Sequence, residues 1–322
     1  MIVLDKSKSE IKKILLACCT CMRPQMLKAA LLSLKNIVVP TNVIVEVLVV
    51  DNDKEQSAKL VIDDLEDIGF KINYAVEPER GLASVRNKLL EVASEMDVSH
   101  LMMFDDDEIL TEDTLMAHVR LLDKYDEDIV SSGICVNVFD ERTPQYIKSN
   151  FIYKRKFSYS KKVGTIKKSC ATDNLFMPMS IVKKHNLRFF SEFVFMGGED
   201  ISFTEQISNL GYKIIHNSDS FLYEPVTESR ANIKYVLNRA YFAGFCGPHI
   251  RFKNEKNKFR KNMYLLKLLV VLLFNCLLFG VSIFCGFSVM LNSLTRISKT
   301  YGKIIGTISS KPLDFYRNIQ GK

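Results

Sequence analysis

The stretch Leu101-Met-Met-Phe104-Asp105-Asp106-Asp107-Glu108 ends a short apolar run with four carboxylates in a row. A solvated turn or the start of the following helix would also accept acids here. Four adjacent carboxylates repel one another, however, and a divalent cation would relieve that repulsion. Mg²⁺ and Mn²⁺ favour oxygen ligands, often one or two carboxylates together with substrate phosphates. The stretch therefore indicates a strand whose end binds a metal, with Asp105 and Asp107 able to point the same way.

On either side of this stretch, apolar runs alternate with segments of helical spacing. The expected strands cover residues 14–20, 43–50, 71–76, 100–104 and 129–136. The expected helices cover residues 26–34, 57–68, 82–95 and 114–124. Strands that are apolar on both faces and alternate with helices predict a parallel sheet covered by helices. Such sheets bind ligands at the carboxyl ends of their strands.

Polar residues follow three of these strands. Thr20-Cys-Met-Arg23-Pro24 follows the first strand, Asp51-Asn52-Asp53 follows the second, and the four acids follow the fourth. Because the carboxyl ends of parallel strands meet at one edge of a sheet, we expect these side chains to share that edge.

Two segments that contain glycine add to this set. Arg80-Gly81, with Arg86-Asn87 after it, leads into a helix and suits contact with a phosphate or a base. Gly197-Gly198-Glu199-Asp200 precedes a helical stretch over residues 201–210. Its acids can cap that helix, or one of them can serve as a general base.

The net charge of +7 is divided unevenly along the chain. Residues 251–322 hold 13 Lys+Arg and 2 Asp+Glu, a net of +11, whereas residues 1–250 hold 31 and 35, a net of −4. Within the body, residues 142–172 are basic and contain no acid, which fits a diphosphate-bearing acceptor, a lipid surface or a solvated loop. The acidic body gives no support to a nucleic-acid partner, and the basic tail favours anionic lipid headgroups.

Residues 268–295 contain no charged side chain and are mostly Leu, Val, Phe and Ile. About 20 apolar residues suffice for a helix to span a bilayer, so this segment predicts membrane insertion rather than a buried core helix. Basic residues stand on both sides of it, which leaves its orientation open. A single span and a re-entrant hairpin bent near Gly280 or Gly286 are the two alternatives. Residues 1–6 contain no apolar core of a signal peptide, so we expect the body at the cytosolic face.

Together the motifs and their order resemble glycosyltransferase family 2, the inverting GT-A class, over about residues 12–245. Thr20-Cys-Met-Arg23-Pro24 resembles the family's T-x-x-R-P start, and Val49-Val50-Asp51-Asn52 resembles its V-V-D-N/D strand end. Arg80-Gly81 through Arg86-Asn87 resembles R-G-x-x-x-x-R-N. The resemblance implies a GT-A nucleotide-diphospho-sugar transferase fold: a Rossmann-like mixed α/β sheet with flanking helices over residues 1–250. A basic, membrane-associating segment over residues 251–322 would follow it.

The resemblance also implies roles for individual residues. Phe104 to Glu108 resembles the DxD motif, which makes Asp107 the direct metal ligand and Asp105 its companion. Gly198-Glu199-Asp200 resembles the E-D motif, which makes Asp200 the base and leaves Glu199 to orient the acceptor or the base, or to cap the helix. Thr172-Asp173-Asn174 resembles the small-residue–Asn segment. The residues implied in binding the nucleotide sugar are Thr20, Arg23, Asp51, Arg86, Asp105, Asp106 and Asn174.

A further resemblance narrows the family to a branch. The stretch from Tyr223 to Arg230, followed by Arg239 to Gly244, looks like the exopolysaccharide glucosyltransferases of succinoglycan assembly. That branch carries V-x-E-P-V-x-x-x-R and an apolar tail. Since the chain contains no Trp, aromatic stacking on the acceptor would fall to Phe or Tyr.

The implied reaction is inverting transfer of a sugar from a nucleotide-diphospho-sugar to a lipid-linked or glycan acceptor, with Mg²⁺ or Mn²⁺, in cell-surface polysaccharide synthesis. Two alternatives remain at this point. A nucleotidyltransferase would need a basic, Gly-rich loop after the first strand, which Cys21-Met-Arg23-Pro24 is not. A non-catalytic, membrane-tethered scaffold would not need Asp107 and Asp200.

Overall fold

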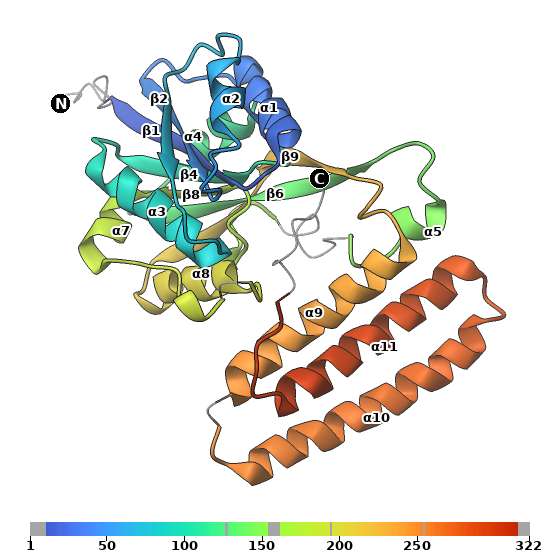
Figure 1. Ribbon diagram of the computed structural model, residues 1–322. Helices are drawn as coiled ribbons and strands as arrows, with labels where there is room; N and C mark the ends of the chain where they lie inside the picture. Colours follow the sequence, from blue (N-terminus) through green and yellow to red (C-terminus); the bar gives the residue numbers. More distant parts are fainter. Residues whose placement is uncertain (1–10, 126–127, 154–161, 194, 254, 315–322) are drawn as a thin grey trace, which may run out of the picture.

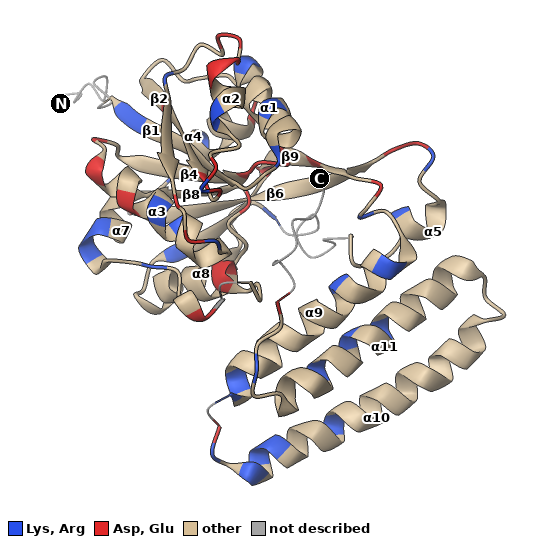
Figure 2. Cartoon of the chain, in the orientation of Figure 1, with Lys and Arg blue, Asp and Glu red and all other residues tan. Residues whose placement is uncertain are grey.

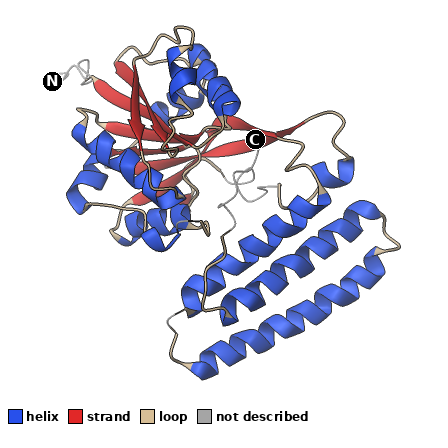
Figure 3. Cartoon of the chain, in the orientation of Figure 1, coloured by secondary structure: helices blue, strands red, loops and turns tan. Residues whose placement is uncertain are grey.

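The computed structural model describes residues 11–125, 128–153, 162–193, 195–253 and 255–314. It shows a twisted sheet with helices on both faces and, beside it, a layer of three long helices (Figures 1 and 3). The strands are β1 (Lys12–Thr20), β2 (Val43–Asp51), β3 (Ile72–Val76), β4 (His100–Asp105), β5 (Ile109–Leu110), β6 (Ile129–Phe139), β7 (Ile166–Lys167), β8 (Leu175–Pro178) and β9 (Lys213–Val226). The helices are α1 (Pro24–Ser33), α2 (Lys59–Asp63), α3 (Leu82–Glu95), α4 (Thr114–Leu122), α5 (Gln145–Lys148), α7 (Met179–His185), α8 (Glu199–Asn209), α9 (Ile233–Phe252), α10 (Lys258–Ser282) and α11 (Phe287–Ile308).

The parallel half of the sheet brings the polar strand ends together. Strand β1 pairs in parallel with β2 on one side and with β4 on the other, and β3 pairs in parallel with β2. Thr20 stands opposite Asp51, and Cys19 stands opposite Asp105. The ends of three strands therefore meet at one edge, as the sequence predicts.

Beyond β4 the sheet is mixed. The nine strands run in the order β3-β2-β1-β4-β8-β6-β9-β5, with β7 beside β9. Strand β8 is antiparallel to both of its neighbours, β4 and β6, whereas β6 and β9 are parallel. The mixed sheet of the GT-A fold is thus confirmed.

One expected helix is much shorter than predicted. Residues 57–68 contain only α2, which ends at Asp63. The chain then turns, with a side-chain oxygen of Asp67 accepting a hydrogen bond from the N–H of Gly69 at a φ of +79°. Residues 65–68 are not helical, so the expectation of a helix through residue 68 is wrong.

The core lies on both faces of the sheet. On β1, Leu15 and Ala17 pack toward α3, α7 and α8, while Ile14 and Leu16 pack toward α1 and α4. This alternation explains why the strand reads as a continuous apolar run, since both of its faces are buried.

The last three helices lie side by side (Figure 1). The chain leaves α10 after Ser282 and begins α11 at Phe287, after Gly286 at a φ of +93°. The apolar stretch 268–295 is therefore bent at Gly286 between two helices and does not form one continuous helix; whether it spans or re-enters a membrane stays a prediction. The predicted domain boundary at residue 250 falls within the last turn of α9.

Glycines let α9 and α11 pack backbone to backbone. A Cβ on Gly302 of α11 would overlap the carbonyl oxygen of Tyr241 on α9, and one on Gly244 of α9 would overlap that of Lys299 on α11. Small residues at contacts of this kind are typical of helices packed in membranes. Among the described residues, one helix, α10, is long and apolar enough to cross a bilayer, with a mean hydropathy of 2.4 over its most apolar 18 residues.

Candidate functional site

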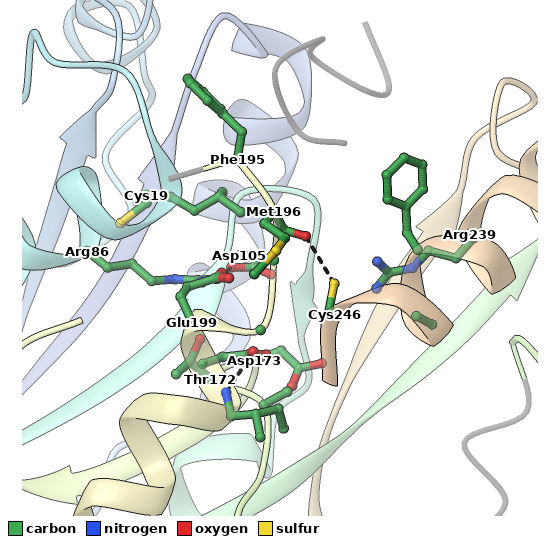
Figure 4. A pocket seen from close by; sticks show the side chains of 18 of the residues that line it. Cys19, Arg86, Asp105, Thr172, Asp173, Phe195, Met196, Glu199, Arg239 and Cys246 are labelled. Carbon is green, nitrogen blue, oxygen red and sulfur yellow. Dashed lines mark hydrogen bonds and ion pairs between the residues drawn. The ribbon is translucent and has the colours of Figure 1, made fainter. Parts of the chain in front are cut away.

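A cavity of about 700 Å³ opens at the carboxyl edge of the parallel strands. It lies between that edge, the start of α8 and one face of α9 (Figure 4). Six residues predicted for the site line it: Arg23, Arg86, Asp105, Asp107, Glu199 and Asp200. The structure thus brings four motifs, far apart in the sequence, around one space.

Arg86 of α3 connects two of these motifs. Its guanidinium group forms an ion pair with the carboxylate of Glu199, and its Nη2 lies 3.5 Å from Oδ1 of Asp105 (Figure 4). Both Arg86 and Glu199 are buried. Burial raises the pKa of the Asp105 carboxyl, Arg86 opposes the rise, and nearby Asp107 and Asp173 add to it.

Asp106 belongs to the framework behind the cavity. Thr20 Oγ1 donates a hydrogen bond to Oδ2 of Asp106 at 2.6 Å, and Nε of Arg23 donates to the same oxygen at 3.1 Å. Burial raises the pKa of Asp106 to about 7, against the opposing effect of Arg23. Thr20 and Asp106 join the ends of β1 and β4, and they leave Arg23 at the cavity wall.

Asp107 is held between two arginines. Its Oδ2 lies 3.2 Å from Nη1 of Arg23 and 2.9 Å from Nη1 of Arg230. Arg230 also forms an ion pair with Glu224 at 3.0 Å. The sequence motifs include Arg230 and Glu224 only in the branch resemblance and do not place them in the site. The stretch Tyr223 to Arg230, which carries the branch resemblance, is the sequence feature that could have indicated these two residues. In the structure its last residue, Arg230, contacts Asp107 of the DxD motif.

Asp200 lies in the first turn of α8 and faces the cavity. Burial raises the pKa of its carboxyl to about 7, Glu199 adds to the rise, and Arg86 opposes it. Gly198 precedes the helix in the left-handed region, and Oδ1 of Asp200 accepts a hydrogen bond from the N–H of Ile201 in the first turn at 2.8 Å. Glu199 uses its carboxylate for Arg86, so the ion pair takes the place of the predicted capping role.

Two predicted residues have their side chains committed to the fold. Asp51 is fully buried and accepts hydrogen bonds from the N–H groups of Asp53 and Ala58 and from the hydroxyl of Tyr74. Its contact with the nucleotide base stays a prediction.

Asn174 lies behind the cavity wall. Its Nδ2 donates to the carbonyl oxygens of Ile134 and Ser220, and its Oδ1 pairs with Nε2 of His118. These contacts fix β8 against β6 and β9, and they explain the burial of His118. The two residues before it, Thr172 and Asp173, line the cavity instead. This geometry argues against direct contact of Asn174 with a nucleotide sugar.

The donor groups at this edge suit a hard divalent cation. The carboxylates of Asp105 and Asp107 both line the cavity. Next to them, oxygens of Glu108 and Asp173 and the sulfur of Cys135 lie within 4.8 Å of one another. Mg²⁺ and Mn²⁺ favour oxygen over a thiol, and Asp105 and Asp107 offer oxygen donors alone. Asp105 and Asp107 therefore fit such an ion better than the cluster around Cys135 does.

The mixed sheet, the acids after β4 and the acidic helix start facing them define a GT-A type of enzyme. Residues 16–185 match the model of glycosyl transferase family 2. That match covers more than half of the chain, so the chain belongs to glycosyl transferase family 2 and is a glycosyltransferase. This match confirms the family resemblance of the sequence. It gives no support to the two alternatives, a nucleotidyltransferase and a non-catalytic scaffold.

The chain is also similar to the succinoglycan biosynthesis protein ExoM of Rhizobium meliloti (strain 1021), with 26% identity over 239 residues, 74% of each chain. Residues 1–349 of S. aureus TarS in complex with UDP-GlcNAc share the fold, with a TM-score of 0.52, 15% identity, and 90% of this chain and 89% of that chain covered. The mannosyltransferase PcManGT of Pyrobaculum calidifontis, in complex with GDP-Man and Mn²⁺, does so with a TM-score of 0.50, 17% identity, and 72% and 61% covered. A longer TarS structure is matched over 39% of its length.

Proposed function

We propose that the protein transfers a sugar from a nucleotide-diphospho-sugar to a hydroxyl group of a lipid-linked or glycan acceptor, with inversion, in cell-surface polysaccharide synthesis. One observation carries the proposal: Asp105, Asp107 and Asp200 line the same cavity as Arg23, Arg86 and Arg230. The relative ExoM is named for succinoglycan biosynthesis, and TarS was captured with UDP-GlcNAc, which supports this class of donor and product.

The arginines suit the diphosphate of the donor. Arg23 and Arg230 both contact Asp107, and a diphosphate at the same edge would accept hydrogen bonds from the same guanidinium groups. The planar guanidinium group binds phosphate through paired hydrogen bonds, which a lysine cannot reproduce. We therefore place the diphosphate beside Asp107, between β1 and the segment after β9.

Asp105 and Asp107 would hold a divalent cation. PcManGT was captured with Mn²⁺ and GDP-Man, and the oxygen donors here suit Mn²⁺ or Mg²⁺. When bound, the ion supplies positive charge against the negative charge of the leaving diphosphate. The arginines that contact Asp107 in this structure already balance part of the charge of that carboxylate.

Asp200 is the proposed general base. Its carboxylate accepts the proton of the acceptor hydroxyl while that oxygen bonds to the anomeric carbon and the bond to the nucleoside diphosphate breaks. A single displacement of this kind inverts the anomeric configuration. A pKa of about 7 suits a base that works near neutral pH. Glu199, held by Arg86, raises the pKa of Asp200 and acts as a positioning residue.

The acceptor would enter along α9. Arg239 and Cys246 of this helix line the cavity (Figure 4), as does Phe242. Other residues of α9 pack on α11. Tyr153 and Tyr235 also line the cavity and offer the aromatic surface that a Trp would otherwise provide. Because α9 joins the cavity to the helical hairpin, we propose that the enzyme works at the cytoplasmic face of the membrane on an acceptor anchored there. The basic stretch 142–172 is expected to face a diphosphate-bearing acceptor or a lipid surface. Four of its basic residues lie outside the described residues: Lys154, Arg155, Lys156 and Lys161.

Product analysis tests this proposal. The purified full-length chain would be incubated with Mn²⁺, a panel of UDP- and GDP-sugars, and lipid extract from cells that make surface polysaccharide. We expect one donor to add a single sugar to a lipid-linked glycan, seen by mass spectrometry, with the anomeric configuration opposite to that of the donor. A product that retains the donor configuration, or transfer of a nucleotide instead of a sugar, would contradict it.

A further inference from the structure

A second cavity, of about 370 Å³, lies in the helical hairpin. Its lining combines aromatic, amide, hydroxyl and cationic side chains. The lining residues are Phe151, Asn275, Arg296, Lys299, Thr300 and Lys303. Arg296, Lys299 and Lys303 are spaced three and then four residues apart on α11, so they lie on one face of that helix. No motif of the sugar-transfer site contributes to this cavity.

Among the described residues, no acid balances the three cations. No acid is among the residues that line the cavity, and within the described parts of the chain none of the three forms an ion pair. Other cations of the tail are paired: Lys253 with Glu192 at 3.2 Å, and Arg260 with Glu255 at 3.3 Å. Like charges on one helix face repel one another, so an anion in the cavity would stabilise the arrangement.

The floor of the cavity is polar, although it lies in an apolar hairpin. Nδ2 of Asn275 on α10 donates a hydrogen bond to Oγ1 of Thr300 on α11 at 3.1 Å. Only 8% of Asn275 and 5% of Thr300 are exposed. This buried pair joins the two helices at the level of the cations and adds polar groups to the lining of the cavity.

The outer face of α10, on the same hairpin, is an exposed apolar surface. Leu273 is 67% exposed, Phe274 60% and Leu277 72%, whereas Asn275, which lines the cavity, is 8% exposed. In Figure 2, most of α10 beyond its first turns is free of charge, whereas α11 carries its basic residues along its middle. A solvated basic face would account for the cations alone. It does not account for the cavity, the buried amide and the apolar surface together.

We propose that the hairpin of α10 and α11 binds an anionic phospholipid, with Arg296, Lys299 and Lys303 contacting its phosphate oxygens and the exposed face of α10 contacting its acyl chains. Basic pockets between membrane-associated helices are known to accept lipid headgroups. The proposal shares with the proposed function only the membrane association of this hairpin and is independent of sugar transfer.

Native mass spectrometry of the full-length protein in neutral detergent tests the lipid site. With phosphatidylglycerol added, we expect one retained lipid per chain, and little retention of phosphatidylcholine. The triple variant R296Q/K299Q/K303Q should lose the retained lipid, with affinity falling about fivefold for each cation removed. Nucleotide release at the transfer site should stay unchanged, which shows that the variant is folded. Should the triple variant fail to fold, Lys303→Gln alone should still weaken retention about fivefold.

The matched control is K256Q/K258Q/K267Q, which removes three exposed cations of the same tail outside the cavity. It should retain the lipid as the wild type does. Equal loss in both triple variants would show diffuse attraction and overturn the proposal. A thermal shift with inorganic pyrophosphate as large as that with phosphatidylglycerol, and lost in R296Q/K299Q/K303Q, would also overturn it, because the hairpin site would then accept a free phosphate without a lipid.

Discussion

Arg86 and Glu199 form a buried ion pair although they lie 113 residues apart in the sequence. The pair joins α3, which follows the first three strands, to the first turn of α8. Oδ1 of Asp105 lies 3.5 Å from Nη2 of Arg86, so this arginine links a DxD acid to the helix that carries the proposed base. Geometry at the sheet edge and the acidity of Asp200 therefore depend on the same contact.

The first prediction concerns the stability of this pair. Glu199→Ala leaves the buried guanidinium of Arg86 with Asp105 as its remaining ion-pair partner. Breaking a buried pair from one side costs about 3–5 kcal/mol of unfolding free energy, and we expect a loss toward the lower end of that range. Urea unfolding would measure it. The double variant R86M/E199L should be more stable than Glu199→Ala, and a single variant as stable as the wild type would show that the pair is not maintained in solution.

The second prediction concerns pH. Burial and Glu199 raise the pKa of Asp200 to about 7, and the base must be deprotonated to accept a proton. The value of kcat/KM should therefore rise with pH through about 7 and level off above it. Glu199→Gln removes one negative charge beside Asp200, so the rise should move to lower pH. If kcat/KM of Glu199→Gln rose at the same pH as that of the wild type, the rise would belong to a group other than Asp200.

The third prediction concerns Arg230. Arg230→Gln removes the contact at 2.9 Å to Asp107 and a proposed ligand of the diphosphate. Hydrogen bonds to charged groups contribute about 1.5–3 kcal/mol, so KM for the active donor should rise by about tenfold or more. Arg120→Gln, on the exposed side of α4, is the control. Steady-state kinetics at saturating acceptor would measure both, and an unchanged KM for Arg230→Gln would remove this residue from the donor site.

The fourth prediction concerns the contact between α9 and α11. A Cβ at Gly302 would overlap the carbonyl oxygen of Tyr241, so Gly302→Ala should push the helices apart and lower the melting temperature in detergent. Gly280 lies within α10, where an added Cβ would meet no atom within 4 Å, so Gly280→Ala should be neutral or stabilise by up to about 1 kcal/mol. If the two substitutions had the same effect, the close approach of α9 and α11 would not hold in solution.

Much of the parallel half of the sheet could be predicted from the sequence, because strands that are buried on both faces have unbroken apolar sequences. The register of Thr20 opposite Asp51 then brings the motifs to one edge. Strand β8 has only four residues, too few to show a period, and its antiparallel place comes from pairing with β4 and β6, which are distant in the sequence. The hydrogen bonds of Asn174 to Ile134 and Ser220 also join distant segments, so Asn174 could not be recognised as a buried structural residue from its sequence neighbours.

Contacts at long sequence distance account for the other omissions. Arg230 reaches Asp107 because the segment after β9 returns to the sheet edge, and neither local composition nor spacing reports that return. A charge-free run indicates only the length of an apolar segment. The turn at Gly286, with its positive φ, shows where the chain bends.

Nucleotide release by Asp107→Asn and Asp200→Asn tests the central claim most directly. Purified wild type, both variants and the control Asp113→Asn, an exposed acid at the start of α4, would be assayed with the active donor, Mn²⁺ and acceptor. General-base catalysis is worth about 10²–10⁴-fold, so Asp200→Asn should lower kcat by that factor. Asp107→Asn should lower kcat/KM, and Asp113→Asn should leave both unchanged. Full turnover in both Asp107→Asn and Asp200→Asn would contradict the account.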